Sequence, residues 1–254
     1  MTFLERVKQA SIQTGLYRPA RWLSRRLRHH QLEAFAADTA FFRSLFEEGA
    51  LVFDVGANVG EKSESLLAAG AQVVAFEPNP LVLPELRARC AGNKRWQLTE
   101  TALGSHADIA RFHARASHGQ SGLLADSPGE IVATYNVPVV TLDSAIRCFG
   151  LPYYCKIDVE GWELEVLSGL SQSIPLLSFE FHLNERDIKK TIACLERLRD
   201  LGAIDVNITA AELPGFLNER WVPISEFIAG FPGDLRKTLP GNPYGDVFVR
   251  GKSA

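Results

Sequence analysis

The chain is poor in cysteine, methionine, net charge and long apolar runs, the features that mark several classes of protein. It has 254 residues but only four cysteines and one methionine, and its formal net charge is −3. No apolar run approaches the roughly 18 to 20 residues that a bilayer-spanning helix needs. The small net charge argues against a protein that binds nucleic acid over its whole surface. With 46% hydrophobic residues, the composition is globular and excludes global disorder, collagen and coiled coil.

The cysteines and the first residues give no sign of a metal site or of secretion. Cys90, Cys148, Cys155 and Cys194 are widely spaced and form no C-x-x-C pair, so we expect no zinc site. The opening MTFLERVKQA has charges throughout and no apolar stretch of signal-peptide length. We therefore expect a cytoplasmic protein with ordinary buried thiols.

The small net charge hides an uneven distribution. Residues 1–30 carry seven basic groups and one acid, a charge of +6, which leaves −9 for the other 224 residues. The segment 18–30 has Trp22, Leu23 and Leu27 at helical spacing. We interpret it as a solvated helix that packs its apolar face on the rest of the protein. Contact with an anionic membrane or an anionic substrate is the less favoured alternative.

The chain divides into a helical start and a longer region of alternating strands and helices. Helical patterning runs over 1–48, where we expect Pro19 to separate two helices and Phe42 and Phe46 to belong to an apolar docking stripe. After residue 50, short apolar runs predict strands at 51–55, 72–78, 96–103, 109–114, 137–142, 153–159, 175–181, 203–209 and 246–250. Residues 115–136, rich in Ser, Gly and Asp, predict a loop.

This alternation predicts a mostly parallel sheet covered on both faces, with the last two strands as an antiparallel edge. We expect a helical extension over 1–48 and a single domain over 49–254. Within that domain, 210–245 has four prolines and several aromatic residues. Two interpretations stay open for it, a lid over the substrate and a packed edge.

The most informative segment is LVFDVGANVG at 51–60. A buried strand ends near Asp54, and Gly56 and Gly60 bracket the turn into a helix, so the backbone can approach a ligand closely. A dinucleotide loop would read G-x-G-x-x-G, whereas this one reads D-x-G-x-N-x-G. The anionic Asp54 disfavours pyrophosphate and favours a cationic ligand. S-adenosylmethionine, with its amino group and sulfonium, suits this loop.

Further acidic residues stand at the ends of later strands. Glu77 ends the next strand, where a carboxylate can accept both ribose hydroxyls of an adenosine. Lys156 and Asp158 share one side of a strand, so this charged pair needs partners or a cleft. Asp158 and Glu160 fall at the carboxyl end of that strand, where open α/β sheets bind ligands.

The segment SFEFHLNE at 178–185 adds a histidine to this edge. Glu180 and His182 share one side at the end of their strand. His182 titrates near neutral pH and suits a general base. The alternative is a loop histidine that hydrogen-bonds to the backbone, and the sequence leaves both open.

Several strings together resemble one known family. FDVGANVGEKS, FEPNP, TALG, TLDS, KIDVEGWELEVLSG and FEFH resemble the FkbM-type family of S-adenosylmethionine-dependent methyltransferases, over about residues 50 to 185. The resemblance implies a class I methyltransferase fold, which is Rossmann-like, with a seven-stranded, mostly parallel sheet and an antiparallel last strand. It also implies O-methylation of a hydroxyl on a sugar, a glycan or a natural-product scaffold.

The resemblance also implies roles for single residues. Ten positions match the family's cofactor-binding residues: Asp54, Gly56, Asn58, Gly60, Glu77, Asn79, Thr101, Ala102, Ser121 and Asp158. The first four would hold the methionine end, Glu77 the ribose, and Thr101 and Ala102 would flank the adenine. Asp158 and Glu160 would face the methyl group and the substrate.

For catalysis, we expect His182 as the base, Glu160 as the second candidate, and Glu180 as the residue that orients His182 or the acceptor. A less favoured variant has Asp158, Glu160 and Glu180 bind Mg²⁺. Two other classes stay as alternatives: a nicotinamide-dependent oxidoreductase on a related fold, and a non-catalytic protein that only binds S-adenosylmethionine. The expected partner is a small-molecule or glycan acceptor, and no nucleic acid.

Overall fold

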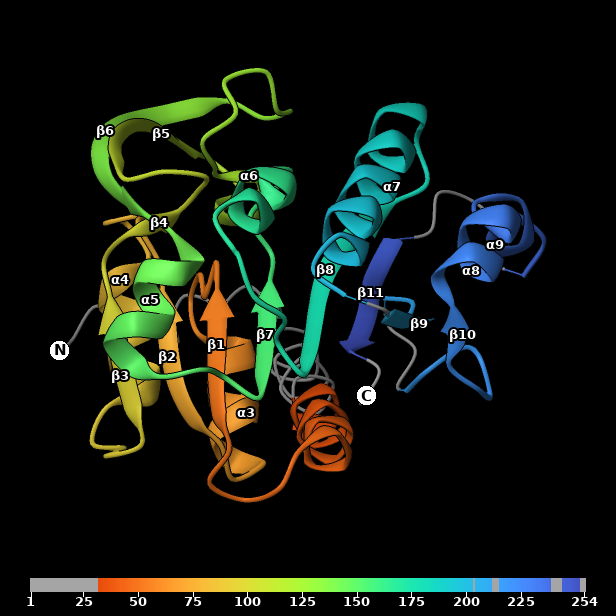
Figure 1. The fold of residues 1–254 in the computed structure, drawn as a ribbon. Helices are drawn as coiled ribbons and strands as arrows, with labels where there is room; N and C mark the ends of the chain where they lie inside the picture. Colours follow the sequence, from red (N-terminus) through yellow and green to blue (C-terminus); the bar gives the residue numbers. More distant parts are fainter. Residues whose placement is uncertain (1–31, 203, 212–214, 239–243, 252–254) are drawn as a thin grey trace, which may run out of the picture.

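Eight strands form the central sheet of the computed structural model, which describes residues 32–202, 204–211, 215–238 and 244–251 (Figure 1). In order across the sheet they are β10 (Val222–Pro223), β9 (Ile204–Ile208), β11 (Tyr244–Gly251), β8 (Leu176–His182), β7 (Tyr154–Ile157), β1 (Leu51–Val55), β2 (Gln72–Phe76) and β3 (Trp96–Thr99). The five strands from β8 to β3 pair in parallel. The predicted mostly parallel sheet is confirmed, with the two-residue β10 as an eighth strand. The expected break at Pro19 and the basic segment 18–30 lie outside the described residues.

The final strand β11 lies inside the sheet. It pairs antiparallel with β8 on one side and with β9 on the other. The expected antiparallel edge of the sheet is confirmed, and within it β11 lies between β9 and β8. The strand β11 contains three side chains that are at most 3% exposed: Val247, Phe248 and Val249. A strand with neighbours on both sides can bury such an apolar run.

Helices cover both faces of the sheet. The face that carries Phe53 and Phe179 packs against α5 (Leu142–Phe149), α6 (Glu163–Ser168) and α7 (Glu185–Arg199). The opposite face packs against α3 (Glu61–Ala68), α4 (Leu83–Cys90) and a helix over residues 32–45. Phe42 and Phe46 lie 6.3 Å from the Tyr154 ring, centroid to centroid, so this part of the expected stripe docks on the sheet. In the described part of the chain, no helix has the length and apolarity of a membrane-spanning segment.

A second, three-stranded sheet lies beyond the carboxyl ends of β1 and β7 (Figure 1). Its order is β4 (Ala102–Leu103), β6 (Ile131–Val140) and β5 (Asp108–Arg115). Two expectations are wrong here. The strand predicted over 96–103 breaks after Thr99, because β4 leaves the central sheet to pair with β6. The loop predicted over 115–136 ends early, because residues 131–136 extend β6 against β5.

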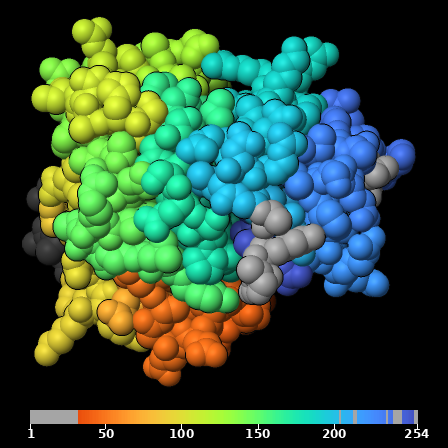
Figure 2. Space-filling view, viewed as in Figure 1, coloured from red at the N-terminus to blue at the C-terminus, as the bar shows by residue number. Residues whose placement is uncertain are grey.

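The segment 210–245 contains β10, α8 (Ile224–Gly230) and α9 (Gly233–Thr238). β10 and α8 contact β9, and α8 also contacts α7. In the space-filling view this blue region lies next to the lighter blue of α7 (Figure 2). Phe227 and Phe231 are buried in the main core, and Phe216 packs edge-on against Phe41 at 5.3 Å. These three side chains are therefore packed against the domain, as the packed-edge interpretation predicts.

Candidate active site

The loop after β1 touches the end of β7 through a glycine. Gly56 has φ of +82°, and a Cβ there would lie 1.7 Å from the Asp158 carbonyl oxygen. Only glycine allows both this backbone conformation and this approach. Gly60 serves a different contact, because its Cβ would lie 2.6 Å from Leu86 Cδ1, where α4 packs against α3.

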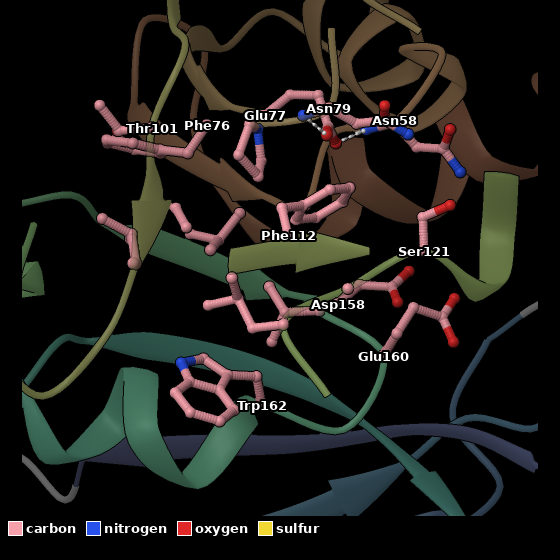
Figure 3. A pocket seen from close by; sticks show the side chains of 18 of the residues that line it. Asn58, Phe76, Glu77, Asn79, Thr101, Phe112, Ser121, Asp158, Glu160 and Trp162 are labelled. Carbon is pink, nitrogen blue, oxygen red and sulfur yellow. Dashed lines mark hydrogen bonds between the residues drawn. The ribbon is translucent and has the colours of Figure 1, made fainter. Parts of the chain in front are cut away.

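Glu77 is fixed at the end of β2 by the main chain. Its Oε2 accepts from the Asn58 N–H and its Oε1 from the Asn79 N–H, both at 2.7 Å (Figure 3). Burial raises the pKa of Glu77 to about 7, against the opposing effect of these two N–H groups. Each carboxylate oxygen keeps a second lone pair, so Glu77 can still accept from a diol.

A narrow cavity of about 80 Å³ opens beside Glu77 (Figure 3). Eight of the ten predicted cofactor residues line it: Gly56, Asn58, Glu77, Asn79, Thr101, Ala102, Ser121 and Asp158. Sequence reasoning missed Phe112 and Trp162, which also line it. Phe112 comes from the second sheet, and Trp162 follows the Glu160–Gly161 turn. Both look like core residues in the sequence, so no local signal marks them.

Two predicted cofactor residues lie outside the cavity lining. Asp54 is fully buried beneath the loop, where its Oδ2 accepts from the Ser63 hydroxyl at 2.5 Å. Burial raises the pKa of Asp54, and the nearby Lys156 opposes this shift. Gly60 stands at the start of α3, in the contact with α4 described above. Any effect of Asp54 on a ligand in this cavity is therefore electrostatic or acts through the loop.

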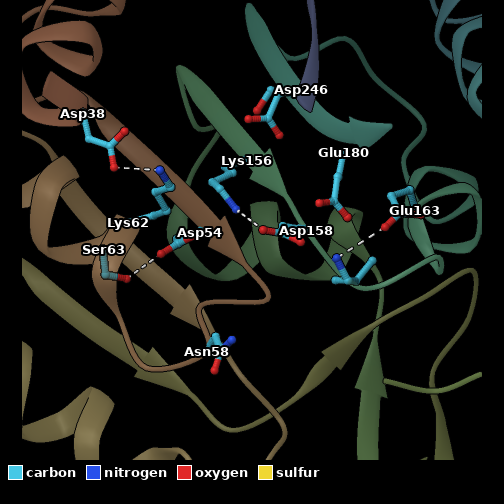
Figure 4. A network of polar contacts seen from close by, with 12 residues as sticks. Asp38, Asp54, Asn58, Lys62, Ser63, Lys156, Asp158, Glu163, Glu180 and Asp246 are labelled. Carbon is cyan, nitrogen blue, oxygen red and sulfur yellow. Dashed lines mark hydrogen bonds and ion pairs between the residues drawn. The ribbon is translucent and has the colours of Figure 1, made fainter. Parts of the chain in front are cut away.

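Lys156 joins several carboxyl groups on one face of the sheet. Its Nζ lies 2.9 Å from Asp158 Oδ2, and Figure 4 shows Asp54 and Asp246 on either side of the pair. Burial lowers the pKa of Lys156, but the carboxylates of Asp158, Asp54 and Asp246 more than offset this and raise it above its usual value. The expectation that the Lys156–Asp158 pair finds partners is confirmed.

Glu160 has a strained backbone at the junction of two cavities. Its φ is +55°, a region that residues with a side chain rarely adopt. Its side chain lines both the cavity beside Glu77 and a larger one of about 600 Å³. Burial, followed by Glu180 and Asp158, raises the pKa of Glu160 to about 8. A carboxyl with a pKa raised this far can hold a proton near neutral pH and donate a hydrogen bond, and its ionised form is a stronger base than an ordinary carboxylate.

Glu180 and His182 form a pair that faces the larger cavity. Glu180 Oε2 lies 3.2 Å from His182 Nε2, and the imidazole stacks on Tyr244 with ring centroids 5.6 Å apart. The hydrogen bond to Glu180 raises the pKa of His182 above its usual value. The partner of His182 is thus a carboxylate, not the backbone that the alternative interpretation expected.

The polar atoms that line the cavity beside Glu77 are of the kinds that S-adenosylmethionine can hydrogen-bond. Asn58 Oδ1, Thr101 Oγ1 and Trp162 Nε1 are buried without a hydrogen-bond partner among the described residues. A bound nucleoside can supply partners for such atoms, and Glu77 can accept from its ribose. In the same part of the chain, no three His, Cys, Asp or Glu side chains gather in the manner of a metal site.

Comparison with known proteins identifies the family of this chain. The chain matches the model of the methyltransferase FkbM domain over residues 54–205. A curated relative, the hexuronic acid methyltransferase AglP of Haloferax volcanii, is 28% identical over 163 residues. That match covers 58% of this chain and 63% of the relative, which is less than two thirds of the relative's length.

Two solved structures are similar in outline. The precorrin-6Y C5,15-methyltransferase of Geobacter metallireducens matches with a TM-score of 0.47 and 13% identity, over 87% of this chain and 88% of the other. A TehB-like methyltransferase of Corynebacterium glutamicum matches with a TM-score of 0.42 and 12% identity, over 92% and 100%. The family match favours a methyltransferase domain over the alternative of a nicotinamide-dependent oxidoreductase. The chain belongs to the methyltransferase FkbM domain family, and its mostly parallel sheet with antiparallel later strands is the architecture that the resemblance implied.

Proposed function

We propose that the protein transfers a methyl group to a hydroxyl of a sugar or glycan. The observation that carries this proposal is the Glu180–His182 pair, which faces a large cavity next to the narrow one beside Glu77. A hydroxyl must lose its proton as it attacks, so it needs a base of this kind. The relative from Haloferax volcanii, named for a hexuronic acid, supports a sugar as the acceptor.

In this proposal the narrow cavity binds the methyl donor. Glu77 accepts from the ribose hydroxyls, and the loop from Gly56 to Asn58 lies along the donor. Bound S-adenosylmethionine supplies a methyl group that its positive sulfur already activates. Asp158, which pairs with Lys156 at 2.9 Å, lines both the narrow cavity and the cavity on the acceptor side of the sheet.

His182 removes the proton of the acceptor. Because Nε2 faces Glu180 at 3.2 Å, Nδ1 is the ring nitrogen left to accept that proton. Glu180 holds the imidazole in place and stabilises the imidazolium that forms. Glu160, whose raised pKa lets it hold a proton near neutral pH, can donate a hydrogen bond to the acceptor, and it stays the second candidate for the base.

The acceptor lies in two larger cavities that meet at Glu180 and Tyr244. One measures about 600 Å³ and the other about 560 Å³, the latter walled by the helix over 32–45. Carboxyl groups and an exposed tyrosine ring suit a hydroxyl-rich sugar. The carboxyls of Glu180 and Asp246 would repel a carboxylate, which favours a hydroxyl as the nucleophile. We propose 49–254 as one catalytic domain and 1–48 as its extension.

A methyl-release assay tests the proposal. Purified protein is incubated with S-adenosylmethionine and a panel of neutral oligosaccharides, sugar acids and small alcohols, and methylated products are located by mass spectrometry. We expect a methyl ether on a sugar hydroxyl. Products that are methyl esters of sugar acids alone would show that the nucleophile is a carboxylate, which needs no base.

A further inference from the structure

Besides Asn58 Oδ1, two buried polar atoms in the cavity beside Glu77 have no hydrogen-bond partner among the described residues. They are the hydroxyl of Thr101 and the indole nitrogen of Trp162, and both residues line the cavity. A polar group that is buried without a partner destabilises the fold, so most such groups in proteins are satisfied. Two of them in one cavity indicate a ligand that satisfies both.

Their surroundings suit a flat aromatic ring. Phe76, Leu103 and Phe112 line the same cavity and are at most 5% exposed. Figure 3 shows the indole nitrogen of Trp162 on the side of its ring that faces the other lining side chains. Glu77, which we assign to the ribose, lines the same cavity. A base attached to that ribose would enter the apolar part, between Thr101 and Trp162.

The position of Trp162 is fixed by the fold. It caps the start of α6, directly after the turn at Glu160 and Gly161, whose φ values are +55° and +98°. A Cβ at Gly104 would lie 2.8 Å from Val139 Cγ1 and 3.5 Å from the indole nitrogen. Glycine at 104 therefore makes room for the edge of the Trp162 ring beside β6.

We propose that Trp162 and Thr101 recognise the base of the methyl donor by hydrogen bonds. An indole N–H can only donate, so it bonds a ring nitrogen of the base. A hydroxyl can also accept, so Thr101 bonds the amino group of the base. This inference rests on the proposed placement of the donor, with its ribose at Glu77.

Substitution of single polar atoms tests it in the full chain. Trp162→Phe removes the N–H and keeps a ring, and Thr101→Val removes the hydroxyl and keeps the shape. By calorimetry, each variant should bind S-adenosylhomocysteine about three- to ten-fold more weakly than the wild type, the loss expected for one hydrogen bond. A wild-type dissociation constant in both variants overturns the proposal.

Trp96→Phe is the matched control. The indole nitrogen of Trp96 is also buried without a partner, but Trp96 stands in β3 and does not line the cavity. Its substitution should leave the affinity unchanged, and an equal weakening would overturn the proposal. Free adenosine should lose affinity in Trp162→Phe by the same factor as S-adenosylhomocysteine, and unchanged adenosine binding would contradict a contact to the base. If the wild type binds neither ligand, the proposed donor site itself fails.

Discussion

The donor side and the acceptor side of the strand ends hold their carboxyl groups in different ways. On the donor side, two backbone N–H groups fix Glu77 at 2.7 Å each. On the acceptor side, Glu180 raises the pKa of Glu160 and lies 3.2 Å from the His182 imidazole. Main-chain hydrogen bonds therefore hold the carboxylate on the donor side, whereas the side chains on the acceptor side change each other's pKa. Variants and pH should affect the two sides separately.

The largest effect should come from His182 on the acceptor side. His182→Ala should lower kcat by about 10²- to 10⁴-fold, because it removes the proposed base. The affinity for S-adenosylhomocysteine should not change, because His182 does not line the donor cavity. The exposed His106 offers a control, and His106→Ala should keep full activity. Wild-type turnover in His182→Ala would show that another group takes the proton.

On the donor side, we expect a substitution at Gly56 to lower both stability and donor binding. Gly56→Ala places a Cβ 1.7 Å from the Asp158 carbonyl oxygen in a left-handed conformation, so the loop must shift. We expect a loss of about 2–5 kcal/mol in the free energy of unfolding, measured in urea, together with weak binding of S-adenosylhomocysteine. Gly92 has φ of +75° and no atom within 4 Å of its would-be Cβ, so Gly92→Ala separates backbone strain from the clash. That control should cost about 1 kcal/mol and spare binding.

Stability should fall as the pH rises, on both sides. The pKa values of Glu77 and Glu160 are raised to about 7 and about 8 in the folded protein, from 4.5. At a pH between the unfolded and the folded pKa, the folded state keeps a proton that the unfolded state has released. The free energy of unfolding therefore decreases as the pH rises through this range. Urea unfolding from about pH 5 to about pH 8 checks this decrease. Glu160→Gln should flatten the upper part of the curve, and an unchanged curve would exclude a raised pKa at Glu160.

The smallest effect should be a shift in the activity profile of the acceptor side. Glu180 raises the pKa of His182, and His182 acts as a base only when neutral, so activity should rise with pH through this raised pKa. Glu180→Gln should move this rise to lower pH, since the carboxylate no longer stabilises the imidazolium. A rise at the same pH in both proteins would show that it reports a different group.

The sequence predicted the donor side better than the acceptor side, for a physical reason. The strand-end pattern of Asp54, Gly56 and Glu77 is local, and parallel strands bring their carboxyl ends to one edge. The pattern does not tell a residue in the cavity from one beneath it, so the burial of Asp54 under the loop was not foreseen.

Distant pairings escaped the sequence analysis. β4 pairs with β6, more than 30 residues later, and β11 enters between β8 and β9, so neither neighbour follows from adjacent residues. The strand content of 131–136 was hidden behind a loop-like composition at 115–130. Trp162 and Phe112 resemble core residues, and only their place beside Glu77 marks them as part of the cavity.

The interior position of β11 bears on the order in which the protein is made. The donor cavity is lined by residues between Val55 and Trp162, whereas the acceptor side also needs Tyr244 and Asp246. Chains emerge from the ribosome amino end first and fold as their segments become available. Every segment that binds the donor is therefore synthesised before the strand that completes the acceptor side, and a nascent chain can contain the whole donor site while it still has no place for the sugar.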